Sequence, residues 1–91
     1  MIGISIDELK DALLHGHEAE FTYNHKDYSI ESANSDSGYI VKIWEIGSEP
    51  MCISERHICD ERDLMELFEK KCFQGKSFLD IESRITVKTI F

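Results

Sequence analysis

The clearest pattern in the chain is an alternation of apolar and polar residues on both sides of Asn24-His25. A two-residue turn there pairs residues whose numbers sum to 49, which places Phe21 opposite Tyr28. One face of this ribbon then carries aromatic and aliphatic side chains, and the other face carries polar ones. The pattern predicts a β-hairpin, with a longer loop that includes Lys26 as the alternative.

A helix is predicted before this hairpin. Ser5 and Glu8 have the S-x-x-E spacing of a capping box, in which each residue satisfies a backbone amide of the other. Apolar residues at helical spacing follow, and Gly16 is placed to end the helix in a left-handed conformation. We therefore expect a helix over about residues 6–15.

Two further helices are predicted in the second half of the chain. Asp60 is placed as the cap of a second helix that ends at Gly75. Its inner stripe comprises Leu64, Leu67, Phe68, Lys71 and Cys72. Ser77 and Asp80 form another capping pattern, which opens a short third helix through about Ser83.

The remaining apolar runs are short enough to be strands. Residues 39–46 are apolar on both faces, Met51–Ile53 forms a short strand after Pro50, and residues 86–91 alternate. A turn is predicted over residues 34–38. The sum is an α+β domain over residues 1–91, with an antiparallel sheet of four or five strands packed on one face by two or three helices.

The net charge of the chain argues against some classes of ligand. The chain has 18 acidic and 10 basic side chains and a formal net charge of −8. Direct binding of nucleic-acid phosphates or of anionic lipid needs surplus cations, so neither is expected. No apolar run approaches the length of a membrane span, and the start of the chain has no secretory pattern. We therefore expect a cytoplasmic protein with reduced thiols.

Two segments resemble a known pattern. The hairpin F-T-Y-N-H-K-D-Y-S-I spans residues 21–30, and Gly-Lys-Ser-Phe-Leu follows at residues 75–79. They resemble the F-x-Y-N-G-K-x-Y-x-I hairpin and the later G-K-S-L helix start of a family of short, uncharacterised bacterial proteins. This chain has His25 where that pattern has glycine, and Phe78 where it has leucine. The resemblance covers most of the chain and implies a fold, but no activity and no catalytic residue.

The residue types that bind zinc or form a nucleophile–base pair are present, but their spacing fits no usual motif. They are Cys52, His57, Cys59 and Cys72, with no C-x-x-C among them. Each cysteine instead has a packing interpretation, in an apolar strand, before a helix cap or on a helix stripe. Ser77 is interpreted as a helix cap, because the segment before it lacks the glycine and the strand of a phosphate loop. We therefore expect no catalytic, cofactor or metal site and no enzymatic activity.

Acidic residues gather on the polar face of the predicted hairpin, where Glu18, Glu20, Asp27 and Glu31 project the same way. This face is either a solvated outer surface of the sheet or an imitation of a row of phosphates. Small acidic inhibitors of restriction or CRISPR–Cas enzymes, carried by phages and mobile elements, work in the second way.

The next strand offers an apolar patch beside these acids. If Val41 and Ile43 face the helices, then Ile40, Trp44 and Ile46 face outward, which is typical of a binding surface. The alternatives are a strand covered on both faces or an inward Trp44. We expect a small, non-enzymatic, acidic module that binds another protein or a second copy of itself as a homodimer. The alternatives are the phosphate-mimicking inhibitor and a small zinc or thiol protein.

Overall fold

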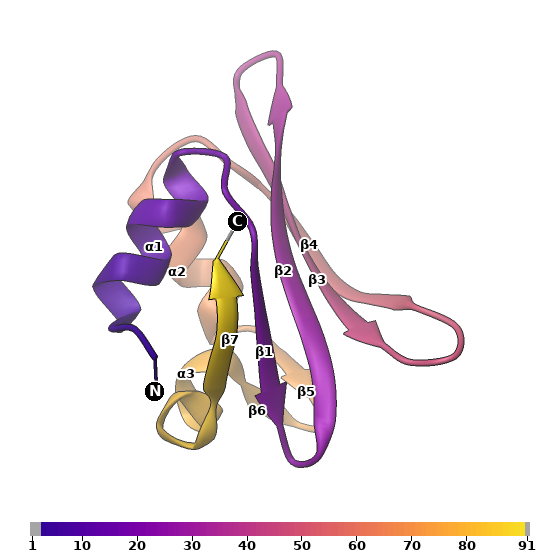
Figure 1. Ribbon diagram of the computed structural model, residues 1–91. Coiled ribbons are helices and arrows are strands. Elements are labelled where there is room, and N and C mark those ends of the chain that lie inside the picture. The colour runs from indigo at the N-terminus through magenta and orange to yellow at the C-terminus, as the bar shows by residue number, and fades with distance from the viewer. Residues whose placement is uncertain (1–2, 91) are drawn as a thin grey trace.

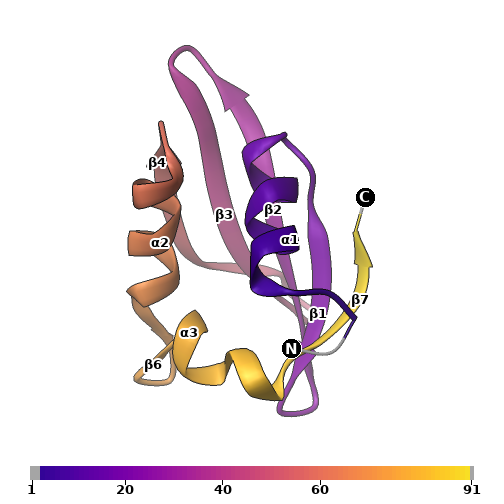
Figure 2. The same ribbon diagram turned by 90° about the vertical axis from the view of Figure 1, so that its left-hand side faces the viewer.

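The computed structural model describes residues 3–90, without the side chain of Thr89. Five strands form one antiparallel sheet in the order β4-β3-β2-β1-β7, and three helices lie on one side of it (Figures 1 and 2). The predicted α+β class is therefore confirmed. The elements are α1 (Ile6–Leu14), β1 (Ala19–Tyr23), β2 (Lys26–Ser35), β3 (Gly38–Ile46), β4 (Met51–Ile58), α2 (Glu61–Glu69), β5 (Lys71–Phe73), β6 (Lys76–Ser77), α3 (Phe78–Ile81), a 3₁₀ turn (Glu82–Arg84) and β7 (Thr86–Ile90).

The β1–β2 hairpin has the predicted register, with Phe21 opposite Tyr28. Its turn consists of Asn24 and His25 alone, whose φ angles are 52° and 62°. Two successive left-handed residues are what a type I′ turn requires, and this turn matches the twist of the strands beside it. The longer loop that was the alternative is therefore excluded.

The predicted helix caps are also confirmed. The Ser5 hydroxyl accepts from the backbone N–H of Glu8 at 3.1 Å, which fixes the start of α1. The predicted box is only half formed there, because the Glu8 carboxylate accepts from the Ser5 hydroxyl at 3.3 Å and not from the Ser5 backbone N–H. The Asp60 carboxylate accepts from the Asp63 N–H at 3.1 Å and starts α2. At α3, Ser77 and Asp80 cap each other reciprocally, at 3.1 and 2.9 Å. Ser77 is therefore a cap, as predicted.

Aromatic rings fill the space between the sheet and the helices. Phe78 of α3 is fully buried and stacks on Phe68 of α2, with ring centroids 4.7 Å apart. Its other side meets Phe21 of β1 edge-on at 5.7 Å. Leu9 and Leu13 of α1 complete this core from the other end. The core therefore takes one side chain layer from the sheet and one from the helices.

The second helix is shorter than predicted. It ends at Glu69, and residues 71–73 turn back to pair with residues 76–77 as a small β5–β6 hairpin. Gln74 and Gly75 form its turn, with φ angles of 54° and 85°. Cys72 therefore lies on a strand and not on the helix stripe. Phe73, which follows it, reaches the core beside Tyr28.

Pairing around β3 is more extensive than predicted. β2 continues to Ser35, so the turn is two residues long, and β4 runs for eight residues instead of three. Gly38 permits this arrangement, because a Cβ atom there would lie 2.2 Å from the carbonyl oxygen of Ile58. The end of β4 is thus held against the start of β3, and the β2–β3 turn extends beyond the helices (Figure 1).

Candidate functional site on the open sheet face

One face of the five-stranded sheet has no helix against it in the part of the chain that is described (Figure 2). Positions that alternate with the buried core residues Phe21, Ile30 and Ile43 point to this side. We call it the open face. Its residues include Glu20, Thr22, Asp27, Ser29, Glu31, Ala33, Ile40, Lys42, Trp44, Ile46, Glu55, His57 and Lys88.

Six of the seven residues predicted to form a surface lie on strands of this face. They are Glu20, Asp27, Glu31, Ile40, Trp44 and Ile46. The seventh, Glu18, immediately precedes β1. Trp44 is out of phase with buried Ile43 and only partly buried. Within the described residues, it therefore neither points into the core nor lies under a second layer.

Trp44 is held in place by its neighbours on β2 and β3. Its indole N–H donates to a carboxylate oxygen of Glu31 at 2.9 Å. Lys42 lies opposite Glu31 in the register, and its ammonium is 6.0 Å from the centre of the Trp44 ring. A hydrogen bond to a charged acceptor and a cation near the ring both restrict the orientation of the indole. The open face therefore carries an oriented aromatic surface at its centre.

Asp27 has cationic and hydroxyl partners on neighbouring strands. Lys88 of β7 donates to its carboxylate at 3.0 Å, and Thr22 of β1 donates at 3.2 Å. The hydrogen bond from Lys88, with that from Thr22, holds the pKa of Asp27 below its ordinary value. On the other side, β3 places Ile46 opposite Asp27, with 42% of its surface exposed.

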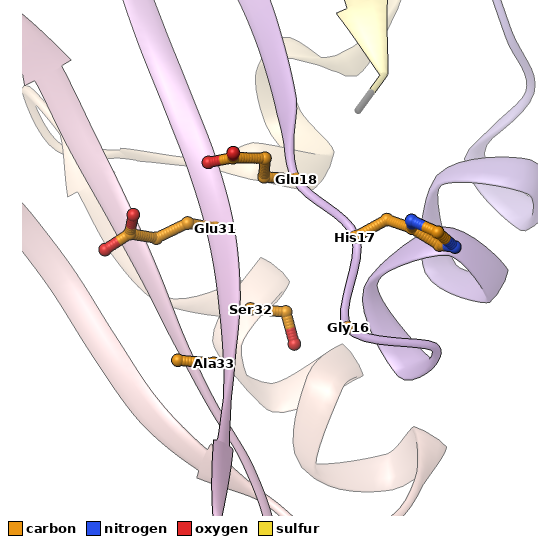
Figure 3. Close-up of a pocket in the computed structure, with 6 residues that line it drawn as sticks. All are labelled: Gly16, His17, Glu18, Glu31, Ser32 and Ala33. Atoms are coloured by element: carbon orange, nitrogen blue, oxygen red, sulfur yellow. The ribbon is translucent and has the colours of Figure 1, made fainter.

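The four predicted acids are therefore not equivalent. Asp27 and Glu31 have partners, whereas Glu18 and Glu20 have no ion pair or side-chain hydrogen bond among the described side chains. Glu18 and Glu31 do come together, lining a pocket of about 440 Å³ between the α1–β1 connection and β2. Figure 3 shows the Glu18 side chain extending from the α1–β1 connection toward β2, from which Glu31 and Ser32 project to opposite sides.

The packing interpretation is wrong for two of the three cysteines. Cys52 lies opposite Trp44 on the edge strand and is exposed, and Cys59 is exposed in the β4–α2 connection. Only Cys72 is partly buried, and burial raises the pKa of its thiol. At Cys52 the prediction failed because β4 has an extra residue, Ile53, between the partners of Ile43 and Trp44, which places Cys52 beside Trp44 on the uncovered side of an edge strand.

A cluster around His57 was not predicted. Its Nε2 atom lies 2.8 Å from the hydroxyl of Ser35 and 3.2 Å from that of Ser37. Its Nδ1 atom lies 3.9 Å from the sulfur of Cys59. His57 lies on β4 and Cys59 is the first residue after the strand, so strand alternation does not by itself predict their contact. The serines come from the far end of β2 and its turn, which no local pattern connects to His57.

Within residues 3–90, no group of three or more His, Cys, Asp and Glu side chains is arranged to hold a metal ion. Across the same residues, no helix combines the length and the apolar character that crossing a bilayer requires. The chain matches no family model, no curated protein and no solved structure. The resemblance to the family of short bacterial proteins stays a prediction.

Proposed function

We propose that this protein is a non-enzymatic module that binds another protein through its open face. The observation that carries the proposal is Trp44, which the hydrogen bond to Glu31 holds on a face that no helix of residues 3–90 covers. Ile40 and Ile46 flank it along the same strand. Aromatic side chains with restricted rotamers are the residues that most often dominate binding energy at protein interfaces.

Charge indicates the chemistry of the partner. Glu18, Glu20 and Glu31 border the apolar stripe, and the whole chain has a formal net charge of −8. A partner with an apolar patch rimmed by Lys or Arg complements this surface, since opposite potentials favour association. Pairing of two open faces from identical chains brings like charges together, which argues against a homodimer through this face.

The phosphate-mimic alternative has one observation in its favour, since Glu18 and Glu20 lack cationic partners within the described residues. The cations Lys42 and Lys88 weigh against it, because they lie among the acids. A phosphate row presents uncompensated negative charge at regular intervals. An apolar contact centred on Trp44 is therefore the better-supported mode.

The test is a comparison of variants in a pull-down at low salt, followed by binding measurements with the purified captured protein. Trp44→Ala removes the centre of the surface, and Ile46→Ser changes an exposed side chain with little burden on folding. Met51→Ala is the matched control, because Met51 is 56% exposed but lies one residue out of phase with the open face. Circular dichroism verifies that each variant folds.

We expect wild type and Met51→Ala to bind one partner equally, and Trp44→Ala to weaken binding about 30-fold, the effect of a 2 kcal/mol hot spot. Equal binding by all variants would contradict the proposal. Loss of binding on Glu18→Lys with Glu20→Lys, together with competition by nucleic acid, would instead favour the phosphate mimic. Concentration-dependent sedimentation that Trp44→Ala abolishes would favour a homodimer.

A further inference from the structure

We propose that Cys59 is a thiol site, activated by His57, that reacts with low-molecular-weight disulfides. The inference rests on the His57 cluster at the end of β4 and does not depend on the proposed binding function. The chemical class of the ligand is a disulfide R–S–S–R, which exchanges with the Cys59 thiol to leave a mixed disulfide on the protein.

The geometry places a base beside an accessible nucleophile. His57 is near the end of β4 and Cys59 is the first residue after it, and both side chains are exposed. The sulfur lies 3.9 Å from Nδ1. On the helix side, the Cys59 backbone N–H donates to Asp63 at 3.0 Å, which fixes the chain at this residue.

Two serines make His57 suited to hold a proton. The Ser35 and Ser37 hydroxyls both lie within hydrogen-bond distance of Nε2, at 2.8 and 3.2 Å. When the thiol proton moves to Nδ1, the imidazolium has two N–H groups. Nε2–H donates to the serine oxygens and Nδ1–H faces the thiolate, so both donors of the imidazolium are satisfied. This arrangement allows His57 to act as a general base toward the Cys59 thiol.

The reaction balances without a further oxidant. The Cys59 proton passes to His57 Nδ1, and the thiolate attacks one sulfur of R–S–S–R. A Cys59–S–S–R bond forms while the original S–S bond breaks, and the leaving R–S⁻ takes the proton from the imidazolium to depart as R–SH. One disulfide and one thiol enter, and one of each leaves.

The same chain contains a matched control thiol. Cys52 is also exposed, but its sulfur donates to the carbonyl oxygen of Ser54 at 3.4 Å, and among the described residues no histidine lies within hydrogen-bond distance of it. Cys72 is partly buried, and burial raises the pKa of its thiol. Burial should make Cys72 slower to react than an exposed thiol, and within residues 3–90 only Cys59 has a histidine within hydrogen-bond distance of its sulfur.

The experiment measures thiol exchange with 4,4′-dithiodipyridine, an uncharged disulfide whose released thione absorbs light. One variant retains only Cys59, with Cys52→Ser and Cys72→Ser, and its match retains only Cys52, with Cys59→Ser and Cys72→Ser. Each is made with and without His57→Gln, on the full chain, with circular dichroism to verify folding. Peptide mapping by mass spectrometry, on wild type treated with limiting glutathione disulfide and digested without reductant, then locates the mixed disulfide.

We expect Cys59 to react at least about tenfold faster than Cys52, as thiolate activation by a neighbouring base provides. His57→Gln should reduce the Cys59 rate to that of Cys52 and leave the Cys52 rate unchanged. Equal rates for the two thiols with His57 intact would overturn the proposal. The proposal would also be overturned if Cys59 reacted fast but His57→Gln left its rate unchanged. A mixed disulfide located on Cys52 would overturn it as well.

Discussion

Replacing His25 with glycine should stabilise the protein. Asn24 and His25 form the turn of the β1–β2 hairpin, and both have left-handed backbone conformations, with φ angles of 52° and 62°. Asparagine and histidine both adopt this region more often than most residues, but each has a Cβ atom that is crowded there and that glycine lacks. The His25 side chain is exposed, so its removal costs little packing. His25→Gly therefore changes mainly the backbone energetics of the turn.

The expected change in the free energy of unfolding is the difference between two backbone contributions, one in the folded state and one in the unfolded state. A left-handed conformation costs a residue with a Cβ atom about 1–2 kcal/mol, and glycine avoids this cost. Glycine also gains freedom in the unfolded chain, which opposes folding by about 0.5–1 kcal/mol. We therefore expect a net gain of about 0.5–1 kcal/mol in the free energy of unfolding. In a domain of this size, that gain raises Tm by about 2–8 °C.

Urea denaturation followed by circular dichroism, with thermal melting as a second measurement, tests this expectation. His25→Ala is the control, because alanine retains the Cβ atom and should leave stability within about 0.5 kcal/mol of wild type. A His25→Gly variant that is no more stable than His25→Ala would refute the reasoning. The left-handed strain at residue 25 would then be compensated by something other than the backbone.

Three further predictions concern the core, the β3–β4 contact and acid stability. Phe78→Ala, at a fully buried ring, should lower the free energy of unfolding by about 3–5 kcal/mol in urea denaturation. Gly38→Ala places a Cβ atom 2.2 Å from a β4 carbonyl oxygen, and should speed amide hydrogen exchange along β4 relative to β1. Hydrogen bonds from the Cys59 backbone and Arg56 lower the pKa of Asp63 from its ordinary value of 3.8, so its stabilisation is present above that pH and lost as pH falls through the lower, folded value. Urea midpoints should thus decline below about pH 4, less steeply in Asp63→Asn.

Local patterns in the sequence predict much of the fold. The alternation around Asn24-His25 determines the hairpin register, since a shift of one residue would move Phe21 out of the core. The caps at Ser5, Asp60 and Ser77 were predictable for a similar reason, because each bond joins residues three apart. The β1–β2 hairpin and these three caps depend on contacts between residues close in the sequence, and the sequence pattern therefore predicts them.

Elements that depend on distant contacts were harder to predict. Leu64, Leu67 and Phe68 continue into Cys72 at helical spacing, yet the chain leaves the helix after Glu69. The left-handed turn at Gln74 instead closes a hairpin that brings Phe73 against Phe21 and Tyr28. Helical periodicity alone does not distinguish these outcomes, because both place an apolar side chain in the core.

The charge distribution on the open face also depends on contacts between residues that are distant in the sequence. The sequence places four acids on one side of the hairpin, but the cations that meet them come from elsewhere in the chain. Lys88 is 61 residues from Asp27, and Lys42 lies opposite Glu31 only because of the β2–β3 register. A count of acids therefore overstates the negative potential at the centre of the face. The Trp44–Glu31 hydrogen bond uses a carboxylate to orient an aromatic ring, and this favours recognition by shape and apolar contact, with charge acting mainly on the rate of encounter.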